Sequence, residues 1–194
     1  ALSVCMTAIA SVCAVFMTPL NISFYGGFYP PTAAILEDVN VDFFDMLEIL
    51  GMILLIPLVM GMTVRYYKPK VADLLNKFTH YGSMIIFGLI IVFAFITNMD
   101  LFLKYIHLVI FVVFAHNAIG IFTGFGLARL FKLPSKDQKT LAIETGIQNS
   151  GLGLALIFSS FSGMGGMVIV AGWWGIWHII SGLSLAYFFR NRSL

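Results

Sequence analysis

The chain has 194 residues, of which 60% are hydrophobic and only 10% are charged, and its formal net charge is +2. Soluble domains usually carry about 25% charged residues on a hydrated surface, so this composition excludes an ordinary water-soluble fold. The basic residues are scattered between apolar runs, which gives no continuous face for nucleic acid. We therefore expect an all-α, polytopic membrane protein whose main surroundings are lipid.

The apolar runs predict one transmembrane domain over residues 1–194, because a spanning helix needs about 20 mostly apolar residues. The expected spans are, in chain order, about residues 1–25, 46–67, 78–98, 103–131, a broken one over 134–161, and 167–189.

Several residues give these spans a finer interpretation. The first span reads as a half-helix over about residues 1–9 that runs into a tightly packed span. Residues 28–48, which contain Pro30-Pro31 and five acids, form a predicted extramembrane loop with a possible interfacial helix at its end. Pro57 should kink the second span. A short acidic turn is expected around Asp100.

The fourth expected span contains three glycines. We expect Gly120, Gly124 and Gly126 to allow close approach of a neighbouring helix.

The bases favour one orientation, because cytoplasmic loops collect Lys and Arg. A cytoplasmic C-terminus leaves Lys104 as the one base outside. It places these bases inside: Arg65, Lys68, Lys70, Lys77, Arg129, Lys132, Lys136, Lys139, Arg190 and Arg192. We therefore expect a multi-pass protein of the cell membrane.

The segment from Glu144 to Gly153 places a carboxylate and two carboxamides, Gln148 and Asn149, between apolar stretches. Such groups are costly at membrane depth unless they are paired, line a water-filled cavity or bind an ion. An alternative is that residues 132–149 form a polar loop with Glu144 in water.

The glycines and small polar residues of this segment predict a helix that is broken near residues 148–151. A break frees backbone carbonyls, which together with a carboxylate are good Na⁺ ligands, and the next half-helix favours an anion at its N-terminus. Ser3 and Thr7 lie four residues apart on one helix face and offer two hydroxyls. Their alternative role is ordinary bonding back to helix carbonyls.

Two other functions remain open at this point. Glu144 could titrate in a proton-coupled carrier or channel instead of coordinating sodium. Glu144 and His178 could also form the acid/base pair of an intramembrane hydrolase, but no HExxH spacing or nucleophile motif accompanies them.

The chain resembles the bile acid:sodium symporter family, in particular its bacterial members, over essentially all of its length. The most specific match is the run Glu144-Thr-Gly-Ile-Gln-Asn-Ser-Gly. The supporting matches are Lys139-Thr140, Trp177-His178, Ser181-Gly182, Leu2-Ser-Val, Thr7, Thr18-Pro19, Leu55-Ile56-Pro57 and His116-Asn117-Ala-Ile-Gly120.

The resemblance implies a fold of ten helices in two inverted five-helix repeats. The fourth and ninth helices are broken and cross each other in a core domain that moves against a panel domain. By this resemblance the chain is the C-terminal portion, from the second half of the fourth helix through the tenth, so the sodium sites should be incomplete without the earlier helices.

The resemblance also implies the function and the site residues. The function would be sodium-coupled symport of organic anions such as bile acids by alternating access, with Na⁺ as the coupling ion, no cofactor and no enzymatic reaction. The residues that match sodium ligands, several through their carbonyl oxygens, are Ser3, Thr7, Glu144, Thr145, Ile147 and Gln148. Asn149 and His178 match positions near the substrate cavity, whereas Ile179 stands where the relatives carry Asn.

Overall fold

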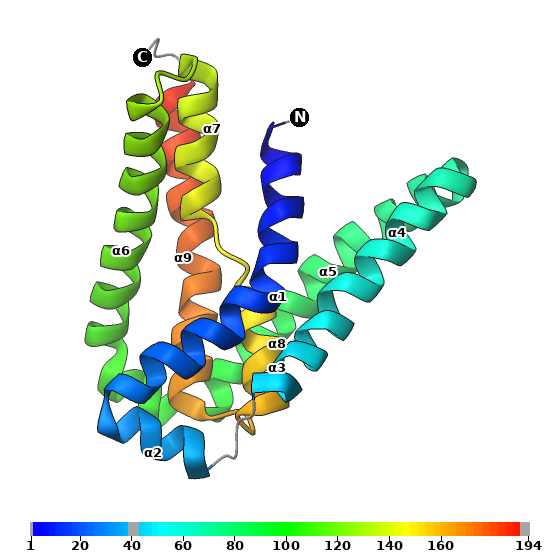
Figure 1. The fold of residues 1–194 in the computed structure, drawn as a ribbon. Coiled ribbons are helices and arrows are strands. Elements are labelled where there is room, and N and C mark those ends of the chain that lie inside the picture. The colour runs from blue at the N-terminus through cyan, green and yellow to red at the C-terminus, as the bar shows by residue number, and fades with distance from the viewer. Residues whose placement is uncertain (1, 39–42, 191–194) are drawn as a thin grey trace. The chain divides into compact units, whose positions relative to one another are not determined.

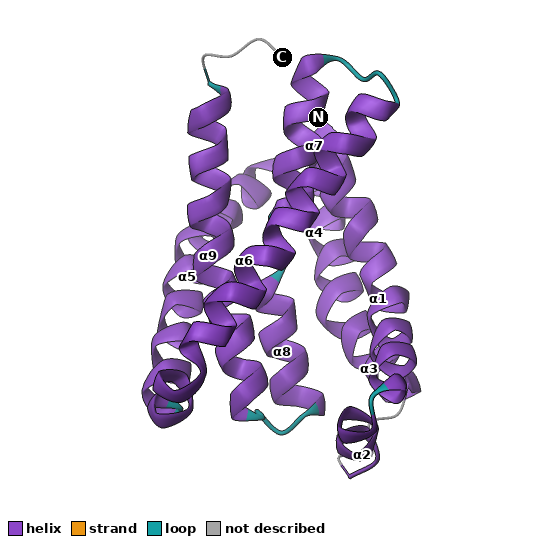
Figure 2. Cartoon of the chain, turned by 90° about the vertical axis from the view of Figure 1, so that its left-hand side faces the viewer, coloured by secondary structure: helices purple, strands orange, loops and turns teal. Residues whose placement is uncertain are grey.

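A computed structural model describes residues 2–38 and 43–190, and within these ranges every regular element is a helix (Figures 1 and 2). Six of the described segments are long and apolar enough to cross a membrane. They are Cys5–Phe28, Phe43–Tyr67, Pro69–Thr97, Met99–Leu130, Ser135–Ser160 and Gly165–Phe189. The expected all-helical class with six candidate spans is therefore confirmed.

The chain divides into two compact units. The first contains residues 1–8, 94–154 and 165–194, and the second contains residues 9–93 and 155–164.

In the first unit, α6 (Met99–Leu130), α7 (Ser135–Gly146) and α9 (Gly165–Phe189) lie side by side (Figure 1). Its apolar core is Val109 and Val113 of α6 with Ile169 of α9. Aromatic residues pack around this core, including Trp173, Trp174 and Trp177 of α9 and two phenylalanines. This packing holds α6 and α9 together, and α7 contacts both of them.

Two glycines of α6 allow α7 to approach closely. A Cβ atom added at Gly120 would lie 2.9 Å from the Thr145 carbonyl oxygen, and one added at Gly124 would lie 2.0 Å from Thr145 Oγ1. The prediction of close approach is confirmed at both positions. It is wrong at Gly126, where an added Cβ would meet nothing within 4 Å because this residue is on an open face.

The second unit contains most of α1 (Leu2–Phe28), then α2 (Pro30–Asp38), α3 (Phe43–Leu50), α4 (Ile56–Tyr67) and most of α5 (Pro69–Thr97). A π-helical turn over Gly51–Leu55 joins α3 to α4. The proline ring of Pro57 would clash with the carbonyl four residues earlier in a regular α-helix, and a wider turn relieves that conflict. The distortion predicted at Pro57 thus takes the form of a π-turn just before it.

The N-terminal part of the chain differs from expectation in two places. The half-helix expected over about residues 1–9 is not a separate element, since α1 runs on to Phe28 through Pro19. No Gly or Pro lies near residue 9 to end the helix. The loop expected over residues 28–48 has a helix, α2, at its start and not only at its end, because Pro30 and Pro31 suit a first helical turn, where a missing N–H is not needed.

Two further boundaries also differ. The helix expected from about residue 78 begins at Pro69, because its basic first turns extend the same helix beyond the apolar stretch. Asp100 lies in the first turn of α6, not in a turn of its own, and there its charge is favourable to the helix dipole. Arg192, one of the C-terminal bases, lies outside the described residues.

Candidate functional site

The predicted break separates α7, which ends at Gly146, from α8 (Ser150–Ser160). The interruption at residues 147–149 overlaps the position expected from the sequence. Glu144 lies in the last turn of α7 and is half-buried. The alternative that residues 132–149 form a polar loop is therefore wrong, because most of that segment is helical.

Glu144 is held by two hydroxyls from the start of α1. Ser3 Oγ donates to Glu144 Oε2 at 2.5 Å, and Thr7 Oγ1 donates to Glu144 Oε1. Thr7 Oγ1 also lies 3.0 Å from the Ser3 carbonyl oxygen, so bonding back along the helix is present as well. Four side-chain oxygens from segments about 140 residues apart in sequence thus converge at the end of α7.

The other groups at the break satisfy the two helix ends. Gln148 Nε2 donates to the Thr145 carbonyl at 2.8 Å, and Asn117 Nδ2 donates to the Gly146 carbonyl at 2.7 Å. The Leu152 amide donates to Asn149 Oδ1 at 3.0 Å, which is a helix N-cap for α8. The carboxamides therefore satisfy backbone groups that the interruption frees inside the candidate span Ser135–Ser160, and such groups are costly in a membrane when unpaired.

Asn117 belongs to a run that supports the family resemblance, but the sequence did not predict its role at the break. It is 3% exposed and crosses from α6 to the end of α7. The signal that could have identified it is a carboxamide inside a long apolar helix, because such a group needs a partner in the membrane.

We expect Asn117→Ala to destabilise the protein by about 1–2 kcal/mol, since it leaves the buried Gly146 carbonyl without its donor. The measurement is the free energy of unfolding in detergent. Asn21→Ala, a change at an exposed asparagine of α1, is the matched control. Equal stability of the two variants would contradict a structural role for the Asn117 bond.

Thr145 and Ile147 direct their side chains away from Glu144 and toward neighbouring helices. Thr145 Oγ1 lies 2.9 Å from the Gly120 carbonyl oxygen and 2.7 Å from the Leu141 carbonyl oxygen, and it can donate its one proton to either. The Ile147 Cδ1 atom would lie 2.9 Å from a Cβ added at Gly182 of α9. If these two residues serve an ion, they do so through their carbonyl oxygens.

The two expected substrate residues differ in their surroundings. Asn149 is exposed at the break, whereas His178 is 7% exposed within α9. His178 Nδ1 has no hydrogen-bond partner among the described residues. His178 lies one helical turn from Gly182, which contacts Ile147, so both lie on the α9 face near the break. His116 contacts Trp174 of α9, with ring centroids 4.9 Å apart, so it helps to pack α6 against α9.

The electrostatics of this arrangement favour a cation. The C-terminal end of a helix carries partial negative charge, and Glu144 adds a carboxylate to that end of α7. No Lys or Arg follows until Arg190. The N-terminal end of α8 carries the opposite partial charge, so the break presents a cation-favouring end and an anion-favouring end close together in sequence.

Comparison with known proteins gives a family match and a set of relatives. The model of the Sodium Bile acid symporter family matches residues 1–105. An uncharacterized sodium-dependent transporter of Bacillus subtilis, YocS, is 30% identical over 196 residues, covering 99% of this chain and 56% of the relative. The mouse sodium/bile acid cotransporter 5 is 29% identical over 83% of this chain and 36% of its own length.

A third relative is a probable chloroplastic sodium/metabolite cotransporter of rice, 28% identical over 83% of this chain and 37% of the relative. The chain thus spans little more than half the length of these relatives, or less. The Glu144 segment lies beyond the family match, but inside the alignment with YocS, which covers 99% of the chain.

Proposed function

Because the chain belongs to the Sodium Bile acid symporter family, a family of sodium-dependent transporters and not of enzymes, we propose that it forms part of a symporter that takes up organic anions. Uptake would be driven by the sodium gradient through alternating access. Bile acids are one candidate substrate class, and smaller organic acids are another, since one relative is named as a metabolite cotransporter.

The observation that carries this proposal is the set of oxygens around Glu144. The two hydroxyls of Ser3 and Thr7 and the carboxylate are hard donors of the kind that Na⁺ prefers. In discontinuous transporter helices, carbonyls at the C-terminal end of a half-helix coordinate Na⁺. The carbonyls of Thr145, Ile147 and Gln148 stand at that end of α7. Sodium would offset the unfavourable charge of Glu144 next to the helix end.

The anion would bind on the other side of the same break. The N-terminal end of α8 favours negative charge, and Asn149 is exposed there. His178 lies on the face of α9 near the break, and its Nδ1 atom has no hydrogen-bond partner within residues 2–38 and 43–190. Ile179 offers no hydrogen bond beside it, which favours an anion with a large apolar part over one that is polar all round.

The same proposal includes an orientation. The protein would lie in the cell membrane with its C-terminus in the cytoplasm, because the basic ends of α4, α6 and α9 then share the cytoplasmic side. The ion and the anion would then be released on the side of these basic ends.

The test is uptake of ³H-taurocholate by vesicles that hold the full-length protein, with and without a sodium gradient, beside Gln148→Ala. We expect uptake to require sodium and to fall at least about tenfold in the variant, because the Gln148 amide holds the Thr145 carbonyl in place. Gln138→Ala is the matched control, since Gln138 bonds the Leu133 carbonyl at the other end of α7.

The outcomes separate the competing functions. Sodium that stabilises the protein against heat without taurocholate uptake would keep the coupling and exclude bile acids. Uptake that persists in choline medium and follows a pH gradient would show that the coupling ion is the proton, with Glu144 titrating. No effect of sodium in either measurement would overturn the symporter proposal.

A further inference from the structure

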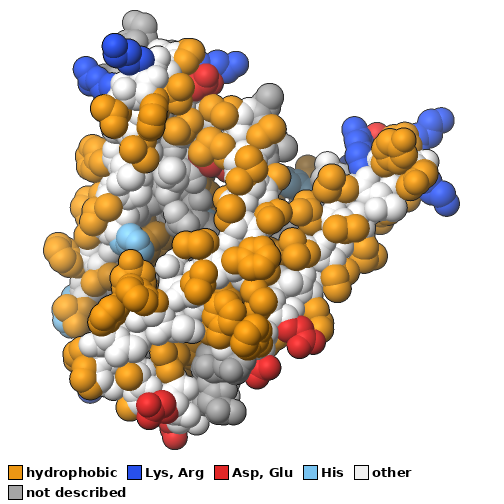
Figure 3. Space-filling view, in the orientation of Figure 1, with side chains coloured by type: hydrophobic (Ala, Val, Ile, Leu, Met, Phe, Trp, Pro, Cys, Tyr) orange, Lys and Arg blue, Asp and Glu red, His pale blue; other side chains and the backbone are white. Residues whose placement is uncertain are grey.

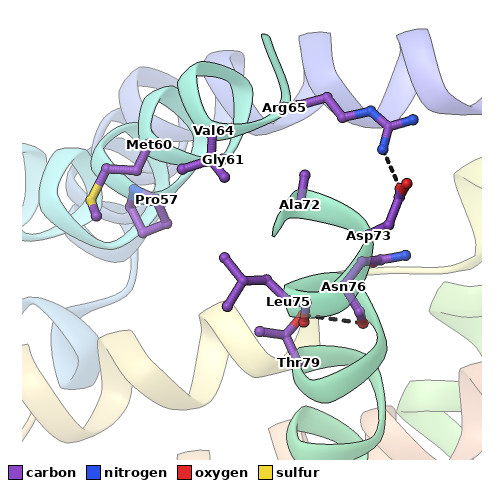
Figure 4. A pocket seen from close by; sticks show the side chains of 10 residues that line it. All are labelled: Pro57, Met60, Gly61, Val64, Arg65, Ala72, Asp73, Leu75, Asn76 and Thr79. Atoms are coloured by element: carbon purple, nitrogen blue, oxygen red, sulfur yellow. Dashed lines mark hydrogen bonds and ion pairs between the residues drawn. The ribbon is translucent and has the colours of Figure 1, made fainter. Parts of the chain in front are cut away.

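A cleft between α4 and α5 lies in the second unit and takes no part in the break described above. Its volume is 850 Å³, within the range of about 300–1,000 Å³ that is typical of ligand sites. Pro57, Met60 and Val64 line it from α4. Leu75 and Thr79 face them from α5 (Figure 4). The Thr79 hydroxyl already donates to the Leu75 carbonyl at 2.8 Å, so the lining away from the charged end is mainly apolar apart from the Asn76 carboxamide.

The mouth of the cleft, at the connection between α4 and α5, lies beside several bases. Arg65, at the end of α4, pairs with Asp73 of α5 across the opening (Figure 4). Lys68 alone joins the two helices, and Lys70 follows in the first turn of α5. Lys and Arg side chains therefore gather at this end of the hairpin (Figure 3), with four bases, counting Lys77, against one acid.

Two exposed tyrosines mark the level of this mouth relative to a bilayer. Tyr66 and Tyr67 follow Arg65 and are 80% and 74% exposed. Tyrosines concentrate at membrane–water interfaces, where their rings lie among the headgroups. We therefore expect the basic mouth at the level of the headgroups. The apolar part of the cleft, further along the same two helices, would lie at the level of the acyl chains.

We propose that this cleft binds an anionic phospholipid. One acyl chain would lie between Met60 and Leu75, and the phosphate would lie beside Lys68 and Lys70. Basic pockets between transmembrane helices bind such headgroups, and the positive end of α5 adds to the attraction. A packed protein helix would fill the apolar part but leave the excess positive charge without a partner, whereas a phospholipid supplies both an acyl chain and a phosphate.

The experiment compares dioleoyl phosphatidylglycerol with dioleoyl phosphatidylcholine bound to the purified protein, measured by native mass spectrometry from detergent. We expect phosphatidylglycerol to bind at least about tenfold more tightly, because Lys68 and Lys70 follow the mouth of the cleft along the chain and add positive charge beside the Arg65–Asp73 pair. Equal binding of the two lipids would overturn the proposal. Displacement of phosphatidylglycerol by millimolar inorganic phosphate would also overturn it, since the ligand would then be free phosphate.

Two pairs of variants test the two parts of the site. Gly61→Leu should abolish lipid retention by filling the cleft, since an added Cβ there meets nothing within 4 Å and the helix is not disturbed. Gly88→Leu, on an equally open face of α5 away from the cleft, should bind as the unchanged protein does. Identical retention by these two variants would show that the lipid lies elsewhere.

The variants that remove charge are tested by the same comparison of phosphatidylglycerol with phosphatidylcholine binding. Joint replacement Lys68→Gln and Lys70→Gln should remove the preference for phosphatidylglycerol, while Lys132→Gln with Lys136→Gln should keep it. A preference that survives the first pair would overturn the headgroup assignment. Because binding is read without transport, these results do not depend on the symporter proposal.

Discussion

Replacing Glu144 by Gln is expected to abolish sodium-dependent uptake by the full-length protein. Gln keeps the size of the side chain and one acceptor for Ser3 or Thr7, but it removes the charge that a cation would require at the end of α7. Loss of one member of a desolvated charge pair costs about 2–5 kcal/mol, or roughly 30-fold to several thousand-fold in affinity. The uptake that remains should be the same with and without sodium.

The control for this change is Asp137→Asn, which removes a carboxylate from the first turn of the same helix. We expect it to leave the sodium dependence unchanged, because Asp137 lies more than one turn from Glu144 and outside the break. Binding should be measured as well, by the rise in melting temperature with added NaCl. A Glu144→Gln protein that is still stabilised by sodium as strongly as the parent would remove Glu144 from the ion site.

The sequence predicted the position of the break and the type of chemistry there, because both depend on local patterns. A carboxylate and two carboxamides among glycines, inside an apolar run, can be accommodated in a membrane in few ways without a large free-energy cost. Separation of α7 from α8 follows from residues 147–149 themselves. The proximity of Ser3 and Thr7 to Glu144 was different, because it rested on resemblance, and the structure shows it through two hydrogen bonds.

Sequence patterns were less informative about helix ends and about partners across helices. Pro30-Pro31 is read equally well as a loop or as the first turn of a helix, and α2 takes the second form. Asn117 could be identified as a buried carboxamide, but not its partner. The Gly146 carbonyl comes within hydrogen-bond distance only because Gly120 and Gly124 let α6 pack against α7. Gly126, two residues further on, faces away because a helix turns by about 100° per residue.

We expect Gly124→Ala to lower the free energy of unfolding by about 2–3 kcal/mol. Its Cβ would lie 2.0 Å from Thr145 Oγ1 and 2.7 Å from the Leu141 carbonyl oxygen. The threonine side chain could rotate, but the carbonyl belongs to the backbone of α7, so the two helices must separate. Overpacking of this kind typically costs about 1–3 kcal/mol, and here it also breaks the bond from Thr145 to the Gly120 carbonyl.

Gly126→Ala is the matched change on the same helix and should have the opposite sign. Its Cβ enters open space, and Ala in a helix interior is favoured over Gly by roughly 0.5–1 kcal/mol. Thermal unfolding in detergent, followed by tryptophan fluorescence, measures both variants. Because α7 carries Glu144 and Thr145, the Gly124→Ala protein should also lose sodium-dependent uptake, while Gly126→Ala keeps it. If both variants melt as the parent does, α6 and α7 do not pack through Gly124, and the position of Glu144 must be fixed by other contacts.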